Sequence, residues 1–267
     1  MSLENKPKIG LALGSGGLRG LAHIGIIKVL LKNNIQIDYI SGSSVGSLVG
    51  AYFAAYGEIE SFEEILFKNS KELLPLFFDF GLQGGIVNGS KINLFLEKIL
   101  KDKDFSETKI PFYIVATDLS NGQPVFFSSG KLVPAVRASI SIPIFFKPQS
   151  YQDKFLADGG LCDPVPVEIL KQNGANKVLA VNLYHPNEFA GNKFTFTDIA
   201  LRSTRIALHN LSKVAVKNAD LVLNPDTSKY LDEIKVKDYF KVENIKKMIK
   251  VGEDEALKYL SEIKKLV

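Results

Sequence analysis

Two short apolar segments near the start of the chain each end in a glycine-rich turn, and each turn leads into a helical stretch. Ile9–Leu13 is apolar throughout, as a strand that is buried on both faces of a sheet should be. Residues 37–41 form the second such strand, and the turns occupy 14–17 and 42–46. Strands that alternate with helices favour a parallel sheet covered by helices. The chain is therefore expected to be an α/β protein.

The alternation continues along the rest of the chain. Further strands are expected at 112–117, 125–128, 155–157, 178–183 and 221–223. Further helices are expected at 18–32, 45–56, 58–74, 90–101 and 198–216, with one or two more in a lysine-rich tail. Asn121-Gly122 lies between two of the expected strands and is a strong hairpin signal. A hairpin adds antiparallel pairs, so the sequence predicts a mixed sheet that is mainly parallel.

The composition narrows the chemistry that the chain can carry. With 267 residues, the chain can bury a substantial core without disulfides or metals. Its 46% hydrophobic and 23% charged residues exclude a disordered or collagen-like protein. A single cysteine, Cys162, excludes an internal disulfide and a thiolate metal cluster, and three histidines leave little for zinc or haem. We therefore expect no metal and no cofactor, and chemistry carried by hydroxyls, carboxylates and backbone amides.

The net charge of +4 is too small to indicate nucleic-acid binding, so no nucleic-acid partner is expected. Most of the excess lies at 235–267, where nine lysines face six acids. This pattern is typical of solvated helix faces, and contact with an anionic membrane surface is the alternative. The sequence shows neither an apolar signal core at its start nor the run of about 18 apolar residues that a transmembrane helix needs. The expected location is the cytoplasm, with peripheral membrane association as the alternative.

The second glycine-rich turn, Gly42-Ser43-Ser44-Val45-Gly46, has the form G-x-S-x-G between an expected strand and an expected helix. In that context the pattern predicts a nucleophile elbow, a tight turn that exposes a serine hydroxyl. The amide of Val45 and the helix N-terminus would stabilise negative charge beside Ser44. A helix cap rich in serine and glycine, with no catalytic role, has the same pattern.

The first glycine-rich turn reads Gly-Ser-Gly-Gly-Leu-Arg-Gly at 14–20. In a parallel sheet it opens on the same edge as Ser44, the edge where ligands bind. Its amides can form an oxyanion hole or cradle the phosphates of a dinucleotide. The dinucleotide fingerprint is imperfect, because Arg19 stands where its last glycine should be and no acid ends the second strand. A tight turn before a closely packed helix is the structural alternative.

Arg19 places a cation in the first turn of the expected helix, where it opposes the helix macrodipole. Such a cation needs a compensating group. A carboxylate in a structural ion pair is one candidate, and an anionic group of a substrate is the other. We expect the ion pair, because structural pairs of this kind are the more common arrangement.

Asp158-Gly159-Gly160 directly follows the strand expected at 155–157. An acid at the carboxyl end of a strand, with glycines that free the backbone to turn, lies in the same crevice as the two glycine-rich turns. An ordinary Asp-Gly turn has the same pattern. Each of the three features is weak alone, and their convergence on one expected sheet edge indicates an active site.

With these motifs in this order, the chain resembles the patatin-like phospholipase family from about Lys8 to Pro225. The resemblance is carried by 16–20, 42–46 and 158–160. It is supported by Ala138-Ser139-Ile140-Ser141-Ile142-Pro143 and by Pro164-Val165-Pro166-Val167. Ser15 departs from the family pattern, which usually has another glycine there. The resemblance implies a three-layer α/β/α fold in a single domain at 1–267, with a core at about 8–225 and a helical tail at 226–267.

The resemblance also implies an activity, namely hydrolysis of a lipid or other acyl ester by a Ser-Asp dyad without a metal. Ser44 would be the nucleophile and Asp158 the proton acceptor. The oxyanion hole would be formed by Gly16, Gly17, Leu18 and Val45. Supporting roles would fall to Arg19, Gly20, Gly42, Gly46, Gly159 and Gly160. The implied enzyme is a carboxylic ester hydrolase of the phospholipase A or lysophospholipase type.

Three other functions remain open from the sequence. Ser44, Asp158 and His185 follow the chain order of an α/β-hydrolase triad, although that fold places more strands before its elbow. The turn at 14–20 alone supports a dinucleotide-binding oxidoreductase. A catalytically silent binding module of the same fold is the third. His23 and His209 lie in expected helices and are given no role.

Residues 73–80 form the most apolar stretch outside the expected strands. Pro75 argues against a continuous helix through this stretch, and three glycines follow it like hinges. A channel for an acyl chain, a lid or a membrane-touching loop would have this composition, and so would a segment of the core. Our hypothesis is that the stretch admits the acyl chain of the substrate.

Overall fold

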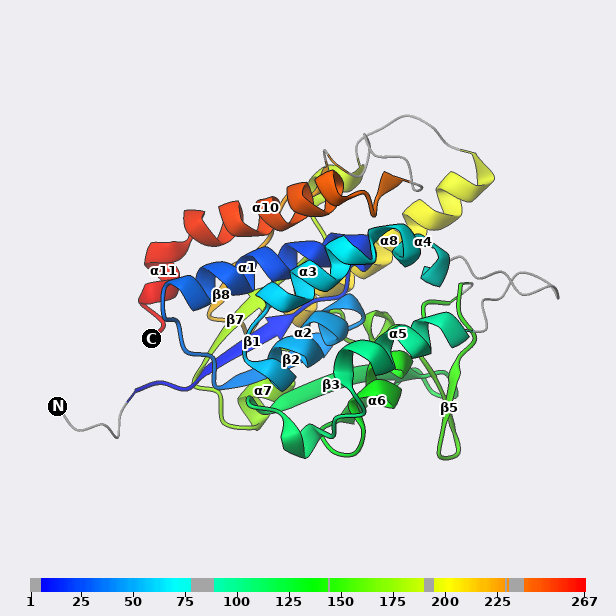
Figure 1. Cartoon of the computed structure of the whole chain (residues 1–267), viewed down its shortest axis with the longest axis horizontal. Coiled ribbons are helices and arrows are strands. Elements are labelled where there is room, and N and C mark those ends of the chain that lie inside the picture. The colour runs from blue at the N-terminus through cyan, green and yellow to red at the C-terminus, as the bar shows by residue number, and fades with distance from the viewer. Residues whose placement is uncertain (1–5, 78–88, 144, 190–194, 229, 231–237) are drawn as a thin grey trace.

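The computed structural model describes the chain except residues 1–5, 78–88, 144, 190–194, 229 and 231–237, which are grey in Figure 1. Its centre is an eight-stranded sheet with the order β5-β6-β3-β2-β1-β7-β8, and β4 pairs with β3 beside this path. The strands are β1 (Ile9–Leu13), β2 (Tyr39–Ser43), β3 (Phe112–Asp118), β4 (Pro124–Phe127), β5 (Gln149–Tyr151), β6 (Lys154–Ala157), β7 (Lys177–Val181) and β8 (Leu221–Leu223).

The sheet has a parallel part and an antiparallel part. In the parallel part β1 lies between β2 and β7, while β3 and β8 extend the parallel order on either side. In the antiparallel part β3 forms a hairpin with β4 and also pairs with β6, which pairs with β5. The predicted α/β class and the mainly parallel, mixed sheet are both confirmed. The hairpin turns at Asn121-Gly122, where the sequence indicated it.

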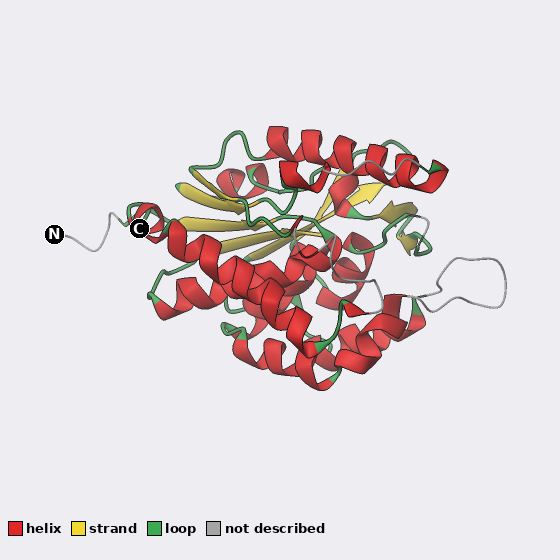
Figure 2. Cartoon of the chain, turned by 90° about the horizontal axis from the view of Figure 1, so that it is seen from above, coloured by secondary structure: helices red, strands yellow, loops and turns green. Residues whose placement is uncertain are grey.

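Helices lie on both sides of the sheet, which gives the molecule three layers (Figure 2). They are α1 (Leu21–Lys32), α2 (Val45–Tyr56), α3 (Glu60–Lys68), α4 (Ser70–Phe77), α5 (Ser90–Leu100), α6 (Leu132–Ser139), α7 (Glu168–Gln172), α8 (Phe196–Ala215), α10 (Val242–Lys258) and α11 (Leu260–Lys264). Short 3-10 turns are η2 (Gly17–Gly20), η3 (Phe105–Glu107), η4 (Gly159–Leu161) and η5 (Pro186–Phe189). The three-layer α/β/α arrangement agrees with the expectation.

The two faces of the sheet are packed unequally. Because side chains alternate along a strand, Leu11 and Leu13 of β1 face one side and Ala12 faces the other. The leucine side joins the main core, which also holds α1, α2, α5 and α6. The alanine side joins a small cluster with α7, the end of α8 and Val178. The second layer is therefore thin, and it covers the parallel strands.

The C-terminal helices pack on the body of the molecule. α10 lies along α1 (Figure 1), and the two backbones approach closely at a pair of glycines. A methyl group on Gly252 would lie 1.9 Å from the carbonyl oxygen of Ala22, and one on Gly25 would lie 2.0 Å from that of Ile249. Ile245 and Met248 are buried, whereas the lysines of α10 are exposed. The lysine-rich pattern thus reflects an amphipathic helix with a solvated face.

Several boundaries differ from the sequence prediction. The helix expected at 58–74 is two helices, α3 and α4, that meet at Asn69, and α4 continues through Pro75 to Phe77. The sequence pattern does not indicate β5, α6 or α7. Pro134 obscures α6, yet it stands third in that helix, where an N–H has no intrahelical partner to lose. β5 and α7 are too short for a periodic pattern, with three and five residues.

Candidate active site

Ser44 stands at the turn between β2 and α2 in a strained backbone conformation. Its φ of 52° and ψ of −124° lie in a region that residues other than glycine rarely adopt. This is the strain expected of a nucleophile elbow. The amide of Ser44 donates to Ser139 Oγ at 2.9 Å, and its carbonyl accepts from Ser47 Oγ at 2.6 Å. Hydrogen bonds on both sides therefore hold the strained residue.

Two glycines allow the elbow to lie against the end of β1 and the first glycine-rich turn. A methyl group on Gly46 would lie 2.1 Å from the carbonyl oxygen of Leu13. One on Gly20 would lie 2.1 Å from Cγ2 of Val45. These contacts place the turn at 14–20 beside the N-terminus of α2, as the sequence predicts.

Asp158 follows β6 and is the hydrogen-bond partner of the Ser44 hydroxyl. Ser44 Oγ donates to Asp158 Oδ2 at 2.5 Å, and the amide of Gly160 donates to Asp158 Oδ1 at 2.8 Å. The backbone of Asp158 is also fixed, since its amide donates to the carbonyl of Ser141 and its own carbonyl accepts from Thr117 Oγ1. The structure thus brings together the two residues that the sequence proposes as a pair.

The electrostatics of Asp158 are dominated by burial. Its side chain and that of Ser44 are both buried, at 7% and 4% exposure. Desolvation raises the pKa of Asp158 to about 6, against the lowering effect of hydrogen bonds from Ser44 and Gly160. Near neutral pH the carboxylate is ionised and is a much better proton acceptor than an exposed aspartate.

Hydrogen bonds to the first two residues of the first glycine-rich turn anchor it to the rest of the fold. The amide of Gly14 bonds to the carbonyl of Val181 and that of Ser15 to the carbonyl of Pro164. The buried ring of His23 contacts the carbonyl of Gly14 through Nε2 at 2.8 Å. Burial lowers the pKa of His23 to about 4, so the ring is neutral and Nε2–H is the donor.

Four amides near Ser44 have no hydrogen-bond acceptor among the described residues, and they are those of Gly16, Gly17, Leu18 and Val45. Val45 is the first residue of α2, whose leading amides have no intrahelical partner. Gly17 has a φ of 57°, which turns the chain into η2. Free amides at a helix N-terminus are the donors that an oxyanion hole uses.

Arg19 is buried rather than exposed. Its Nη1 donates to the carbonyl of Gly16 at 3.3 Å, and its guanidinium lies 5.3 Å from the centre of the Tyr184 ring. Tyr184 Oη is in turn within 3.1 Å of Ser15 Oγ. The carbonyl of Gly16 and the face of the Tyr184 ring are two of the contacts that the guanidinium makes, and through them Arg19 braces the turn that carries Gly16 and Gly17.

Close contacts explain why residues 159 and 160 are glycines. A methyl group on Gly159 would lie 2.2 Å from the carbonyl oxygen of Val115 in β3. One on Gly160 would lie 2.7 Å from Ser15 Oγ. These glycines let η4 pack on β3 and against the first turn. Gly42, the last of the sequence-predicted glycines, makes the same kind of close contact with Gly46.

Ser139 and His23 belong to the site but were not assigned to it by sequence reasoning. Ser139 is fully buried and accepts the Ser44 amide, and His23 holds the carbonyl of Gly14. For Ser139 the signal was its place in the segment at 138–143, which supported the resemblance without a role. For His23 no local pattern exists, because its partner lies across a turn of the fold.

The residues of the rival interpretations lie elsewhere. His185 Nδ1 is 3.6 Å from Asp226 Oδ1, whereas the carboxylate of Asp158 contacts Ser44. Asp38, the acid nearest to the second strand, precedes β2 and bonds to the amide of Ile9, at the opposite edge of the sheet from the glycine-rich turn. Cys162 is half-buried, and burial raises the pKa of its thiol.

Among the described residues, histidine, cysteine, aspartate and glutamate side chains form no cluster of three that is arranged to bind a metal ion. Each described helix is too short or too polar to cross a membrane.

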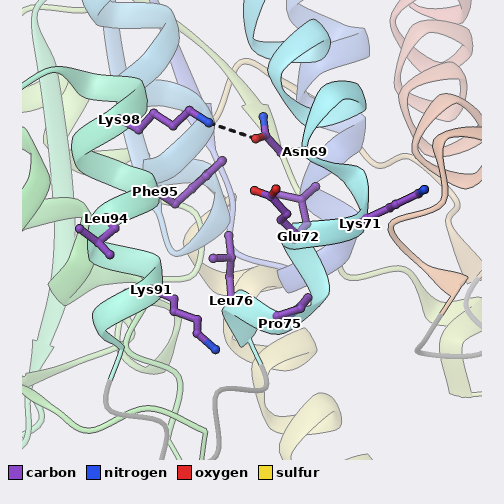
Figure 3. A pocket seen from close by; sticks show the side chains of 10 residues that line it. Asn69, Lys71, Glu72, Pro75, Leu76, Lys91, Leu94, Phe95 and Lys98 are labelled. Carbon is purple, nitrogen blue, oxygen red and sulfur yellow. Dashed lines mark hydrogen bonds between the residues drawn. The ribbon is translucent and has the colours of Figure 1, made fainter.

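A groove of about 410 Å³ lies between α4 and α5 (Figure 3). Its apolar lining is Leu73, Pro75, Leu76, Leu94 and Phe95, and its polar lining is Asn69, Lys71, Glu72, Lys91 and Lys98. Ser44 and Asp158 do not line it. The apolar stretch at 73–80 contributes Leu73, Pro75 and Leu76 to this groove. The rest of that stretch, from residue 78, and the glycines after it lie outside the described residues.

The sequence matches the family model of the patatin-like phospholipases over residues 11–171, which is more than half of the chain. The chain belongs to the patatin-like phospholipase family. The match spans the glycine-rich turn, the elbow at Ser44 and Asp158. The family predicted from the motifs is therefore confirmed.

Curated patatin-like relatives cover about two thirds of the chain. An uncharacterized NTE family protein of Mycobacterium tuberculosis is 37% identical over 181 residues, which are 67% of this chain and 50% of the relative. A lysophospholipase of Aspergillus fumigatus is 32% identical over 182 residues, which are 66% of this chain and 12% of the relative. The chain thus spans half the length of the first relative and a small part of the second.

Among solved structures, the patatin-like chain is similar to VipD from Legionella pneumophila, with a TM-score of 0.64 at 13% identity. The similarity covers 97% of this chain and 67% of VipD. It supports the α/β fold over nearly the whole chain, the tail helices included.

Proposed function

We propose that this patatin-like protein is a serine lipid acyl hydrolase of the phospholipase A or lysophospholipase type. The observation that carries the proposal is the 2.5 Å hydrogen bond from Ser44 Oγ to the buried carboxylate of Asp158. The family and the fungal lysophospholipase relative support a lipid hydrolase. The free amides around the elbow supply the remaining element that acyl transfer needs.

The first half of the reaction acylates the serine. Ser44 Oγ attacks the ester carbonyl while its proton passes to Asp158 Oδ2. The amides of Gly16, Gly17, Leu18 and Val45 stabilise the oxyanion of the tetrahedral intermediate, and the loss of one such donor costs about 3 kcal/mol. The intermediate collapses as the bond to the leaving alcohol breaks, and Asp158 returns the proton to that alcohol.

The second half releases the fatty acid. Asp158 takes a proton from a water molecule, whose oxygen attacks the acyl-enzyme carbonyl. When the bond from the carbonyl carbon to Ser44 Oγ breaks, the proton goes from Asp158 to Ser44. Serine and carboxylate are then as they were at the start, and the balance requires no metal and no cofactor.

A single carboxylate serves as base without histidine because its environment adjusts its pKa. An aspartate in water titrates near 4 and holds a proton too weakly to remove one from a serine. Burial raises the pKa of Asp158 to about 6, which strengthens the base by about a hundredfold and leaves it ionised at pH 7. His185, paired with Asp226, is not needed in this scheme.

The acyl chain is assigned to the apolar stretch at 73–80 and the groove between α4 and α5 that its first part lines (Figure 3). A groove of about 410 Å³ with leucine, proline and phenylalanine walls has the size and character of a site for one lipid chain. Peripheral contact with a membrane would bring such chains to the enzyme.

The test compares three proteins on a panel of phospholipid, lysophospholipid and neutral esters. The wild type should hydrolyse at least one class, Ser44→Ala should lose all turnover, and His185→Ala should keep it within about threefold, because His185 does not contact the dyad. Near-complete loss in a folded His185→Ala protein would replace the dyad with a triad. A folded wild type that is inactive on every ester would contradict the proposed hydrolase activity.

A further inference from the structure

A buried cation near the end of α6 has an unusual set of contacts. Arg137 lies in the last turn of that helix, and its side chain is 1% exposed. Its Nη1 donates to Ser141 Oγ at 2.7 Å, and its guanidinium lies 5.1 Å from the centre of the Phe146 ring. Its Nε and Nη2 have no hydrogen-bond partner among the described residues. Burial lowers the pKa of Arg137 to about 10, and no described carboxylate offsets this effect.

Stability alone does not account for this arginine. A buried charge that lacks a carboxylate partner and leaves two of its nitrogens unsatisfied costs free energy that an apolar side chain of similar size would not cost. The negative end of α6 and the aromatic ring offset part of this cost. The guanidinium also requires close packing, because a methyl group on Gly89 would lie 2.2 Å from Nη2. A buried group with unmet hydrogen bonds needs an explanation, and the contact with Ser141 supplies one.

Arg137 fixes a residue that lies just beyond the helix. α6 ends at Ser139, and Ser141 follows it as a buried residue at 1% exposure. Ser141 Oγ accepts from Arg137 Nη1 and donates to the carbonyl of Arg137 at 2.8 Å. The amide of Ser141 donates to the carbonyl of Ala138 at 3.1 Å. These three hydrogen bonds tie Ser141 to the last turn of the helix, and they fix the direction of its own carbonyl.

The carbonyl of Ser141 holds the backbone of the candidate base. It accepts from the amide of Asp158 at 3.0 Å. Earlier in the same segment, Ser139 Oγ accepts from the amide of Ser44 at 2.9 Å. The segment at 137–141 therefore holds the backbones of both members of the pair. A shift at the end of α6 would change the distance between their two side chains.

We propose that Arg137 is a positioning residue for the reaction, which acts through Ser141 on the place of Asp158. It does not act on the carboxylate itself, whose oxygens accept from Ser44 Oγ and from the amide of Gly160. Transfer of a proton between serine and carboxylate requires hydrogen-bond distance, so a displaced base slows both halves of the reaction. This role rests on the proposed function, because it assigns a further residue to the same site.

Arg137→Met removes the charge and keeps most of the side-chain volume. We expect kcat for a soluble short-chain ester to fall by about 10- to 100-fold with KM within about twofold, because the buried side chain does not reach substrate. The urea midpoint should equal or exceed that of the wild type, because a costly buried charge is gone. Arg137→Lys keeps a donor for Ser141 Oγ and should restore kcat to within about threefold of the wild type. An unchanged kcat in Arg137→Met, or an equal loss in Arg137→Lys, would overturn the proposal.

Ser141→Ala tests the route by which Arg137 acts, and it removes the same hydrogen bond if Arg137→Met does not fold. It should lower kcat to a similar degree, and the double variant should lose no more than either single variant, because both break one contact. Ser212→Ala is the matched control, since its hydroxyl is also buried, accepts from Asn182 and donates to the carbonyl of His209 in its own helix. Losses that multiply in the double variant, or an equal loss in Ser212→Ala, would overturn the route through Ser141.

Hydrogen exchange measured by NMR separates this role from the proposed function, because it needs no turnover. The amide of Asp158 should exchange at least about tenfold faster in Arg137→Met and Ser141→Ala than in the wild type, since its acceptor is no longer fixed. The amide of Gly14, which bonds to the carbonyl of Val181, is the control and should exchange as in the wild type. An inactive wild type whose Asp158 amide still responds would contradict the hydrolase activity and support the tie from Arg137. Unchanged exchange of that amide in both variants would overturn the positioning role, even in an active enzyme.

Discussion

The two turns that meet at the candidate site are built in different ways. At Ser44 the chain is strained, with a φ of 52°, and close-packed glycines fix the turn. At Asp158 the backbone is relaxed, with a φ of −50° and ψ of 132°, and the special feature is a buried carboxylate with a pKa of about 6. The serine depends on local backbone geometry, whereas the aspartate depends on what the rest of the fold packs around it.

This difference explains why the turn at Ser44 is easier to recognise in the sequence than the turn at Asp158. A strained strand-to-helix turn needs small residues at fixed spacing, so it leaves the pattern G-x-S-x-G in the sequence. Asp158 is held in its buried position by hydrogen bonds with residues far along the chain, such as Thr117, Ser44 and Ser141, and these contacts leave no local pattern. Asp158 is therefore recognised in the sequence by its place at a strand end, and the fold places its carboxylate against the Ser44 hydroxyl.

The largest expected effect is on the pH dependence of the free energy of unfolding, which distinguishes the turn at Asp158 from the turn at Ser44. The folded pKa of Asp158 lies about two units above that of an unfolded aspartate, so the folded state binds the extra proton. Asp158 therefore contributes a loss of stability of about 3 kcal/mol as pH rises from about 4 to about 6, in a range where Asp163 and His23, whose pKa values burial also shifts, contribute terms of their own. Asp158→Asn should abolish this loss and be more stable than the wild type at pH 8, while turnover falls by at least about 10³-fold.

Ser44→Ala is the matched control for that measurement. It should lose turnover to the same degree but keep the pH-dependent loss of stability, because the carboxylate remains buried. Chemical denaturation of the three proteins at pH 4.5 and pH 8 checks the prediction. An Asp158→Asn protein with the same pH dependence of stability as the wild type would show that Asp158 is not the desolvated group.

The sequence predicted more of the parallel part of the fold than of the antiparallel part. β1, α2 and β8 have the predicted ends, because buried apolar runs and the elbow are local signals. β5, which has three residues, and α6, with a proline near its start, lack the length or the periodicity that identifies an element. Both depend on tertiary contacts for their conformation.

The same limit applies to the site. The sequence indicated Ser44, Asp158 and the glycine-rich turn, since their residue types are unusual at the carboxyl ends of strands. It gave no role to Ser139 or His23, whose partners are 95 and 9 residues away along the chain. These hydrogen-bond partners can be identified only from the folded structure, in which the turns lie side by side.

The next effect in size concerns the serine turn alone. Ser139→Ala removes the acceptor of the Ser44 amide, and an unsatisfied buried N–H costs about 1–3 kcal/mol. We expect kcat/KM to fall by about tenfold with little change in KM. Ser43→Ala is the control, because the Ser43 hydroxyl is equally buried and has no hydrogen-bond partner among the described residues. Equal effects of both variants would show that Ser139 does not position the nucleophile.

The smallest effect lies away from both turns. Leu76→Lys places a charge in the groove between α4 and α5 and should reduce turnover of long-chain esters by about three- to tenfold, with short-chain esters unchanged. Leu257→Lys, on the exposed side of α10, should change neither. A chain-length series of esters gives the measurement, and equal losses at all lengths would count against the groove as the acyl-chain site.

The most direct test of the central claim joins the two turns in one measurement. A fluorophosphonate reacts with an activated serine, and mass spectrometry identifies the labelled residue. We predict that Ser44 is labelled, that the rate rises about tenfold per pH unit up to about pH 6 and then levels as Asp158 becomes ionised, and that Asp158→Asn is not labelled. Labelling of another residue, or of Ser44 at an undiminished rate in Asp158→Asn, would contradict the Ser44–Asp158 dyad.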